Sequence, residues 1–171
     1  KLRLERGMYV FIREGTAAKN LEALIKYVNY KNNDLICFCT DDKEIIDIEK
    51  ESFNEAWTIE VYQSLYKSYK TDVYAWYEKE QVIAYAVFLD MVDVDELVRI
   101  AVKKEFRGKN YGSDFLRKIL NNFDKNIFLE VRQNNVSAIK LYENTGFKLV
   151  NIRKDYYSDT HENALVMVYD K

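Results

Sequence analysis

The 171-residue sequence contains no proline, five glycines, two cysteines and one histidine. The cysteines, Cys37 and Cys39, alternate along an apolar run, so on a strand they would point to one face, a poor geometry for a mutual disulfide. No further cysteine could complete a disulfide framework. The single histidine, His161, excludes the histidine clusters of many metal enzymes. We therefore expect two core thiols, no disulfide and no bound metal.

The sequence also lacks a long apolar segment and an excess of one charge. No apolar run approaches the roughly 20 residues that span a bilayer, and residues 1–6 lead into no signal-peptide segment. A net charge of -2, with both signs interspersed, argues against a general nucleic-acid binder. A hydrophobic content of 48% is enough for a core of ordinary size. These features predict a globular, cytoplasmic protein.

Apolar periodicity predicts an alternation of strands and helices. The expected strands are residues 8–12, 35–39, 73–78, 81–91, 97–102, 127–132 and 163–169. The expected helices are residues 17–31, 44–53, 58–69, 112–123 and 135–144, approximately. The opening therefore reads as a βαβ-like unit, and the strands at 73–78 and 81–91 read as an antiparallel hairpin because a short turn joins them.

The strand at 97–102 leads through the turn RGKNYG, residues 107–112, directly into an amphipathic helix. Unpaired amides at a helix N-terminus carry about half a positive charge, and glycines allow an anion to approach them closely. The turn has neither the lysine-serine/threonine ending of a nucleoside-triphosphate loop nor the three spaced glycines of a dinucleotide loop. The succession of strand, glycine-bearing turn and helix predicts a phosphate site. The alternative is a turn that merely needs a glycine.

Two motifs identify a family resemblance. The run LEVRQNNVSAIKLYENTGF, residues 129–147, matches the pattern LEVRxxNxxAIxLYxxxGF of the GNAT acetyltransferase superfamily at every specified position. The turn at 107–112 resembles the superfamily's acetyl-CoA pyrophosphate loop, Arg/Gln-x-x-Gly-x-Gly/Ala, with Asn110 in place of the middle glycine. Asparagine tolerates left-handed backbone angles, so the departure is mild. The run IEKESF with Trp57 resembles the ribosomal-protein alanine N-acetyltransferases, and the resemblance spans residues 44–168.

The resemblance implies an α/β fold with a mixed, mostly antiparallel sheet of about seven strands and helices on both faces. Residues 35–39 would supply its first strand. It also implies acetyl-CoA as co-substrate, with no metal. The residues implied to bind it are the strand residues Ile100, Ala101 and Val102, the loop residues Arg107, Gly108, Lys109, Asn110, Tyr111, Gly112 and Ser113, and the helix cap Asn135.

The resemblance assigns proton transfer to two residues. Glu130 would accept the proton of the attacking amine through a water, and Tyr142 would protonate the departing thiolate. A protein α-amine has a pKa of about 8 and is roughly one-tenth neutral at pH 7, so a modest base suffices for it. The alternatives are a Glu130 paired with Arg132 or a surface lysine, and a Tyr142 that only packs in the core.

The acceptor side is less specific. Tyr156 and Tyr157 resemble the tyrosine pair that N-terminal acetyltransferases place over the peptide, although an aromatic hairpin stripe would look the same. The acidic residues at 93–96 form either a solvated loop or a field for a cationic substrate. His161 reads as a solvated turn residue.

The expected function is acetylation of a protein α-amine, with the alanine start of a small-subunit ribosomal protein as the leading candidate. One alternative is an acetyltransferase for another peptide or a small-molecule amine. The other is a non-catalytic module that binds CoA or a partner. Neither nucleic acid nor membrane is an expected partner.

A different family accounts for the first residues. RGMYVFIREGTAAKNLEAL and CFCTDDK resemble an internal piece of adenine deaminase, a metal-dependent amidohydrolase, with Asp41 or Asp42 matching a metal-holding aspartate. Because the other ligands have no counterpart, we interpret the segment as a fused remnant, and a start at Lys1 rather than Met fits a truncated or processed chain. We expect an appendage at 1–34 and the acetyltransferase domain at 35–171.

Overall fold

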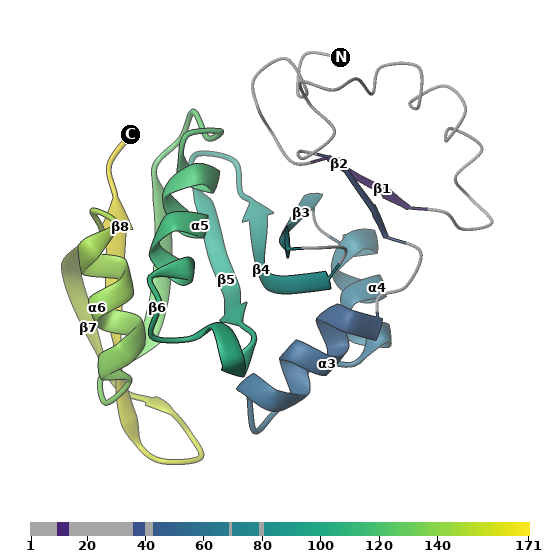
Figure 1. Cartoon of the computed structure of the whole chain (residues 1–171). Coiled ribbons are helices and arrows are strands. Elements are labelled where there is room, and N and C mark those ends of the chain that lie inside the picture. Colours follow the sequence, from purple (N-terminus) through teal and green to yellow (C-terminus); the bar gives the residue numbers. More distant parts are fainter. Residues whose placement is uncertain (1–9, 14–35, 40–42, 69, 79–80) are drawn as a thin grey trace.

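The computed structural model describes residues 10–13, 36–39, 43–68, 70–78 and 81–171 (Figure 1). The strands are β1 (Val10–Arg13), β2 (Ile36–Cys39), β3 (Lys70–Glu78), β4 (Gln81–Asp90), β5 (Asp95–Val102), β6 (Ile127–Arg132), β7 (Lys148–Tyr157) and β8 (Glu162–Tyr169). The helices are α3 (Lys43–Ser52), α4 (Ile59–Ser68), α5 (Tyr111–Leu120) and α6 (Val136–Asn144), with a 3-10 turn, η2, at Lys104–Phe106. The helix expected at 17–31, and Asp41 and Asp42, lie outside the described residues.

Six strands form one sheet in the order β3-β4-β5-β6-β8-β7. All neighbours are antiparallel except β5 and β6, which are parallel. The α/β class and the mixed, mostly antiparallel sheet are therefore confirmed, with six strands where about seven were expected.

The strand expected to open this sheet lies elsewhere. β2 pairs in parallel with β1, from Val10 opposite Ile36 to Arg13 opposite Cys39, and the two form a separate two-stranded sheet. The prediction that residues 35–39 form the first strand of the main sheet was wrong, and β3 lies at that edge.

The core has one layer on each face of the sheet. On one face α5 and α6 pack against the sheet, and the fully buried members of this cluster include Phe115, Leu116, Ile119, Leu129 and Met167. On the other face α3 and α4 cover β3, β4 and β5, with Ile48, Tyr62, Tyr85, Val87 and Ala101 among the buried residues. β4 is buried from Val82 to Leu89, which explains its nearly continuous apolar sequence.

β5 carries a bulge. Val87 of β4 pairs with Arg99, whereas the next residue, Phe88, pairs with Leu97, so Val98 is the extra residue. The bulge places consecutive side chains, Val98 and Arg99, on the face of α3. A bulge increases local twist and bends its strand. It therefore re-aims the second half of β5.

β5 and β6 part soon after they meet. Asp95 pairs with Ile127 and Glu96 with Phe128, and in these fully described strands the pairing ends there. We call the region beyond these pairs the splay. The amide of Lys103 donates to the carbonyl of Ile83 on β4 at 2.8 Å. Because backbone groups alternate along a strand, those of Ile100 and Val102 point toward the splay, and those of Ala101 point toward β4.

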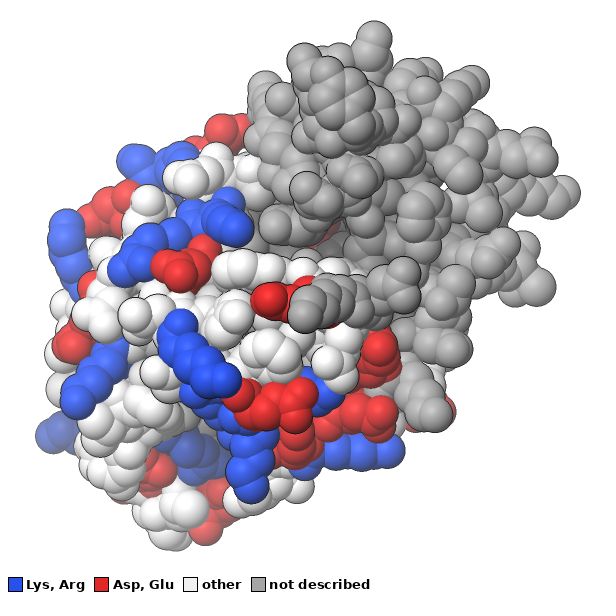
Figure 2. All heavy atoms as spheres, in the orientation of Figure 1, with Lys and Arg blue, Asp and Glu red and all other residues white. Residues whose placement is uncertain are grey.

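Among the helices that the structure describes, none combines the length and apolar character needed to cross a membrane. Figure 2 shows basic and acidic side chains interspersed over the described part of one face, as the charge pattern predicts.

Candidate active site

The loop before α5 adopts the left-handed geometry that its sequence suggests. Gly108 has a φ of 73° and Asn110 a φ of 64°. Nothing lies within 4 Å of a Cβ built on Gly108, so backbone angle rather than space favours glycine there. Asn110 occupies the cap position without a side-chain cap bond. The expectation that asparagine can replace the loop's middle glycine in a left-handed conformation is confirmed.

The loop leaves backbone amides facing outward. The Asp114 amide donates to the Asn110 carbonyl at 3.1 Å and begins the helical ladder, so the amides of residues 111–113 have no place in it. Arg107 holds the loop in position: its Nε donates to the Val102 carbonyl at 2.7 Å and its Nη2 to the Ser52 hydroxyl at 2.8 Å. This arrangement fits a pyrophosphate that is bound mainly through main-chain amides.

A glycine is required at position 112 for a second reason, which the sequence alone did not indicate. A Cβ at this position would lie 2.6 Å from Cδ1 of Leu141 on α6 and 3.4 Å from Cγ2 of Val102 on β5. Gly112 is buried in the first turn of α5. The glycine therefore allows close packing of α5 against α6 and β5, besides any approach of an anion.

Glu130 faces away from the α5 and α6 layer, because it alternates with the core residues Leu129 and Val131. Its side chain is 13% exposed, and Oε1 lies 2.9 Å from Nη1 of Arg153 on β7. The hydroxyl of Tyr156 also donates to Glu130, and this hydrogen bond raises the pKa of Tyr156. The ion pair anticipated with Arg132 or a lysine is thus made with Arg153.

Glu96 lies on the same face as Glu130. It pairs with Phe128 on β6, and alternation puts the side chain of Glu130 on that side of the sheet. Burial raises the pKa of Glu96, the negative charge of Glu130 adds to the rise, and Arg153 lowers it. The neighbouring Asp95, expected in an acidic loop, is instead a buried residue of β5.

Tyr142 lies on the opposite side of β6, within the α5 and α6 layer. It is 8% exposed and its ring centroid lies 5.7 Å from that of Phe147. Burial raises the pKa of Tyr142, and the nearby Tyr157 adds to the rise. The phenol therefore keeps its proton near neutral pH.

Asn135 caps α6 at the carboxyl end of β6. Its Oδ1 accepts from the Ala138 amide at 3.2 Å and from the Ser137 hydroxyl at 3.0 Å. The side chain is exposed, so its amide group faces solvent while the oxygen serves the helix.

The tyrosine pair ends β7. The rings of Tyr156 and Tyr157 meet edge to face at 5.2 Å, with Arg153 above Tyr156 at 5.4 Å and Arg132 above Tyr157 at 3.9 Å. Tyr156 is 45% exposed, and Tyr157 is half-buried. His161 is exposed in the following turn with a φ of 54°, as expected of a turn residue.

The structure thus groups the candidates around the splay. Glu130 and Tyr156 touch, Tyr157 lies near Tyr142, and Ile100 and Val102 present their backbone to the splay. Ala101, expected to bind the cofactor, directs its backbone groups to β4 because it alternates with those two residues.

The sequence comparisons agree with this geometry. The family model described as "Acetyltransferase (GNAT) family" matches residues 43–147, and the chain belongs to this family. The putative [ribosomal protein bS18]-alanine N-acetyltransferase of Bacillus subtilis (strain 168) is 33% identical over 135 residues, which cover 74% of this chain and 87% of that protein. The adenine deaminase of Thermosipho melanesiensis is 54% identical over 48 residues, which cover 28% of this chain and 8% of that enzyme.

Solved structures agree on the fold. The ribosomal-protein-S18-alanine N-acetyltransferase from Escherichia coli superimposes with a TM-score of 0.69 at 26% identity, over 78% of this chain and 90% of that one. A GNAT family acetyltransferase from Elizabethkingia anophelis with acetyl-CoA bound gives a TM-score of 0.58 at 18% identity, over 67% and 84%. The protein is therefore an acetyl-CoA-dependent N-acetyltransferase of the GNAT family.

Proposed function

We propose that this enzyme acetylates a protein N-terminal α-amine, with the N-terminal alanine of a small-subunit ribosomal protein as the leading candidate. The Bacillus subtilis and Escherichia coli proteins support this acceptor through matches over 74% and 78% of the chain. The observation that carries the proposal is the position of Glu130, a largely buried carboxylate beside the splay. A cytoplasmic setting accompanies this proposal because ribosomal proteins are made there.

Acetyl-CoA supplies the acetyl group as a thioester, and we assign its parts to residues around the splay. We assign its pyrophosphate to the loop, where Gly108 and Asn110 take left-handed angles and the first-turn amides of α5 point outward. We assign its amide-bearing chain to the backbone of Ile100 and Val102, and to the amide group of Asn135. The remaining loop residues in the proposed site are Arg107, Lys109, Tyr111, Gly112 and Ser113.

The proposed chemistry divides between the two faces of β6. As the amine nitrogen forms its bond to the acetyl carbon, Glu130 accepts the amine's proton, directly or through a water. As the carbon–sulfur bond breaks, Tyr142 donates its phenolic proton to the departing sulfur and recovers a proton from solvent. A backbone N–H of Ile100 or Val102 in the splay can hold the oxygen that becomes negative in between.

Tyr156 and Tyr157 complete the proposed acceptor site. Tyr156 touches Glu130 and is partly exposed, so its ring can cover the first residues of a peptide whose amine reaches that carboxylate. β7, which carries both tyrosines, is exposed along almost its whole length. A peptide could therefore approach from this side.

We also propose that residues 1–34 are an appendage and that 35–171 form the acetyltransferase domain. The deaminase match of 48 residues supports the first part, and the family match at 43–147 supports the second. β2 follows this boundary directly and pairs with β1 rather than with a strand of the main sheet.

The test is a panel of acceptors assayed by the release of free CoA thiol. Turnover is expected with a six-residue peptide that begins with alanine and contains one lysine. No turnover is expected when the same peptide is N-terminally blocked, because a lysine amine is roughly 200 times less often neutral at pH 7. Turnover with polyamines or aminoglycosides alone would favour a small-molecule enzyme, and CoA binding without turnover would favour a non-catalytic module.

A further inference from the structure

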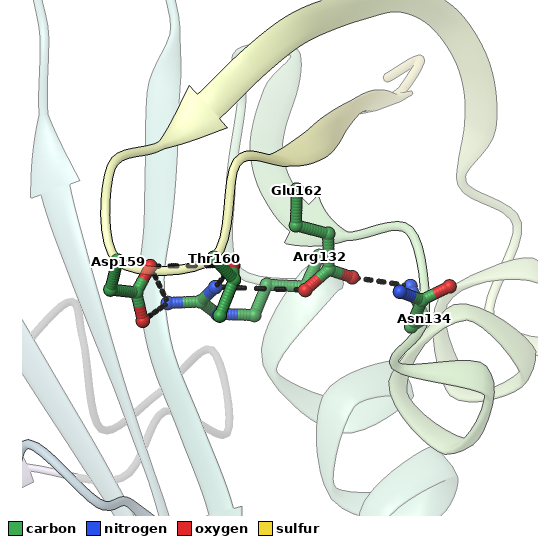
Figure 3. A network of polar contacts seen from close by, with 5 residues as sticks. All are labelled: Arg132, Asn134, Asp159, Thr160 and Glu162. Atoms are coloured by element: carbon green, nitrogen blue, oxygen red, sulfur yellow. Dashed lines mark hydrogen bonds and ion pairs between the residues drawn. The ribbon is translucent and has the colours of Figure 1, made fainter.

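Arg132, the last residue of β6, reaches across the sheet to the turn between β7 and β8 (Figure 3). Its Nη2 lies 2.8 Å and 3.1 Å from the two carboxylate oxygens of Asp159, and its Nη1 donates to the Thr160 hydroxyl at 2.8 Å. Both contacts to Asp159 come from Nη2, while Nη1 bonds Thr160, so the planar guanidinium fixes the orientation of the turn as well as its distance. The turn is therefore held in one position relative to β6.

A second connection strengthens this arrangement. Oε2 of Glu162 lies 3.6 Å from Nη1 of Arg132, while Oε1 accepts from the Asn134 amide at 2.7 Å (Figure 3). The side chain of Glu162 is only 10% exposed. It joins the start of β8 to the turn that follows β6, with Arg132 between them.

The same guanidinium covers Tyr157, whose ring centroid lies 3.9 Å from Cζ of Arg132. Tyr157 in turn meets Tyr156, and the hydroxyl of Tyr156 bonds to Glu130. Arg132 and Glu130 are two residues apart on one face of β6. One arginine thus connects the hairpin tip, the tyrosine pair and the strand that carries the proposed base.

We propose that Arg132 is a positioning residue that fixes the β7–β8 hairpin tip so that Tyr156 and Tyr157 are held over the acceptor peptide beside Glu130; this rests on the proposed function. Arg132 does not touch the reacting atoms in this proposal. The Arg132 and Asp159 side chains are 34% and 48% exposed, so their pair should matter more for the shape of the acceptor site than for folding.

Arg132→Lys and Arg132→Met separate charge from geometry. Lysine keeps the charge but loses the fork and the planar stacking surface. We expect the KM for the alanine-leading peptide to rise roughly 10-fold in both variants, with lysine giving little rescue, while the KM for acetyl-CoA stays within about 2-fold. Asp159→Asn should raise the peptide KM in the same way, and combining it with Arg132→Met should add little, because both variants remove one interaction.

Arg117→Met is the matched control. Arg117 also pairs with an aspartate, Asp114, at 3.1 Å and bridges to another element through the Asn144 carbonyl at 2.9 Å, but it lies on α5. It should leave the peptide KM unchanged. An unchanged peptide KM in the Arg132 variants, or an equal rise in both KM values, would overturn the inference.

A second measurement does not depend on turnover. Amide hydrogen exchange of residues 156–162 in the enzyme without substrate should accelerate at least about 10-fold in Arg132→Met and not in Arg117→Met. Unchanged exchange there would refute the positioning role whatever the acceptor. Conversely, accelerated exchange in an enzyme that leaves the peptide unmodified would locate the failure in the proposed function.

Discussion

The buried pair of Glu49 and Arg99 offers a sharp test of how α3 is fixed to the sheet. Glu49 is 0% exposed, its Oε1 lies 3.3 Å from Nη2 of Arg99, and it accepts from the Trp57 amide at 2.8 Å. The Arg99 guanidinium lies over the rings of Phe53 and Trp57 at 4.1 Å and 4.4 Å. The pair thus joins α3 and the turn after it to the bulge of β5.

The cost of removing one partner follows from burial. Glu49→Leu leaves the Arg99 guanidinium without its counterion, and Arg99→Met leaves the buried Glu49 carboxyl without its cation. Each change should lower the free energy of unfolding by about 3–5 kcal/mol. The Arg99 side chain is 18% exposed, so water can solvate part of its unpaired charge. Glu49→Leu should therefore lower the free energy of unfolding by about 3 kcal/mol. At roughly 2–4 °C per kcal/mol, the melting temperature should fall by roughly 6–12 °C.

The double variant is the decisive measurement. With both charges removed, no buried charge remains, so Glu49→Leu with Arg99→Met should cost much less than the sum of the single changes. Urea unfolding followed by tryptophan fluorescence gives all three values. Lys148→Met is the control, since its pair with Asp170 is 74% and 63% exposed and should be worth at most about 1 kcal/mol. Additive losses, or single losses below about 1 kcal/mol, would refute the reasoning.

Two other predictions concern the candidate site, and a third returns to Glu49. Glu130→Gln should lower activity roughly 10²-fold, and activity should recover in part at high pH, where the amine deprotonates unaided. High pH should not restore the activity of Tyr142→Phe. Both variants should still bind acetyl-CoA when binding is measured by calorimetry. Gly112→Val should raise the KM for acetyl-CoA more than the KM for peptide, and overpacking should lower the free energy of unfolding by about 1–3 kcal/mol. Adding Leu141→Ala should restore the stability but not the KM for acetyl-CoA. Burial raises the pKa of Glu49, so its contribution to stability is full below about pH 4.5 and falls as pH rises through the raised pKa; Glu49→Gln should flatten this slope in urea titrations at several pH values.

Local patterns predicted much of the fold. Three of its features depend on residues that are close together in the sequence. They are the apolar stripe of α5, the hairpin of β3 and β4, and the cap of α6 at Asn135. The left-handed angle of Asn110 belongs to the same class, because it reflects the residue's own backbone preference. These features need no knowledge of the rest of the chain.

Features set by distant pairing could not be predicted in this way. β7 is exposed at nearly every position, so it carries no alternation of buried and exposed residues that would indicate a strand. β5 begins at Asp95 because parallel pairing with Ile127 extends it into the acidic segment. Likewise, the partner of Glu130 is decided by the register that brings Arg153 of β7 beside β6. The family motif suggested Glu130, but only the sheet order identifies its neighbours.

The bulge at Val98 links these distant features to the proposed chemistry. A fully paired β5 and β6 would use the backbone groups of Ile100 and Val102 in the ladder and leave none for a ligand. Glu130 and Tyr142 lie on opposite sides of β6, so a base and an acid can meet one substrate only where the sheet opens. The bulge bends β5 just after its pairing with β6 ends. The feature that exposes the proposed binding edge therefore also gives the two proposed proton-transfer residues a common site.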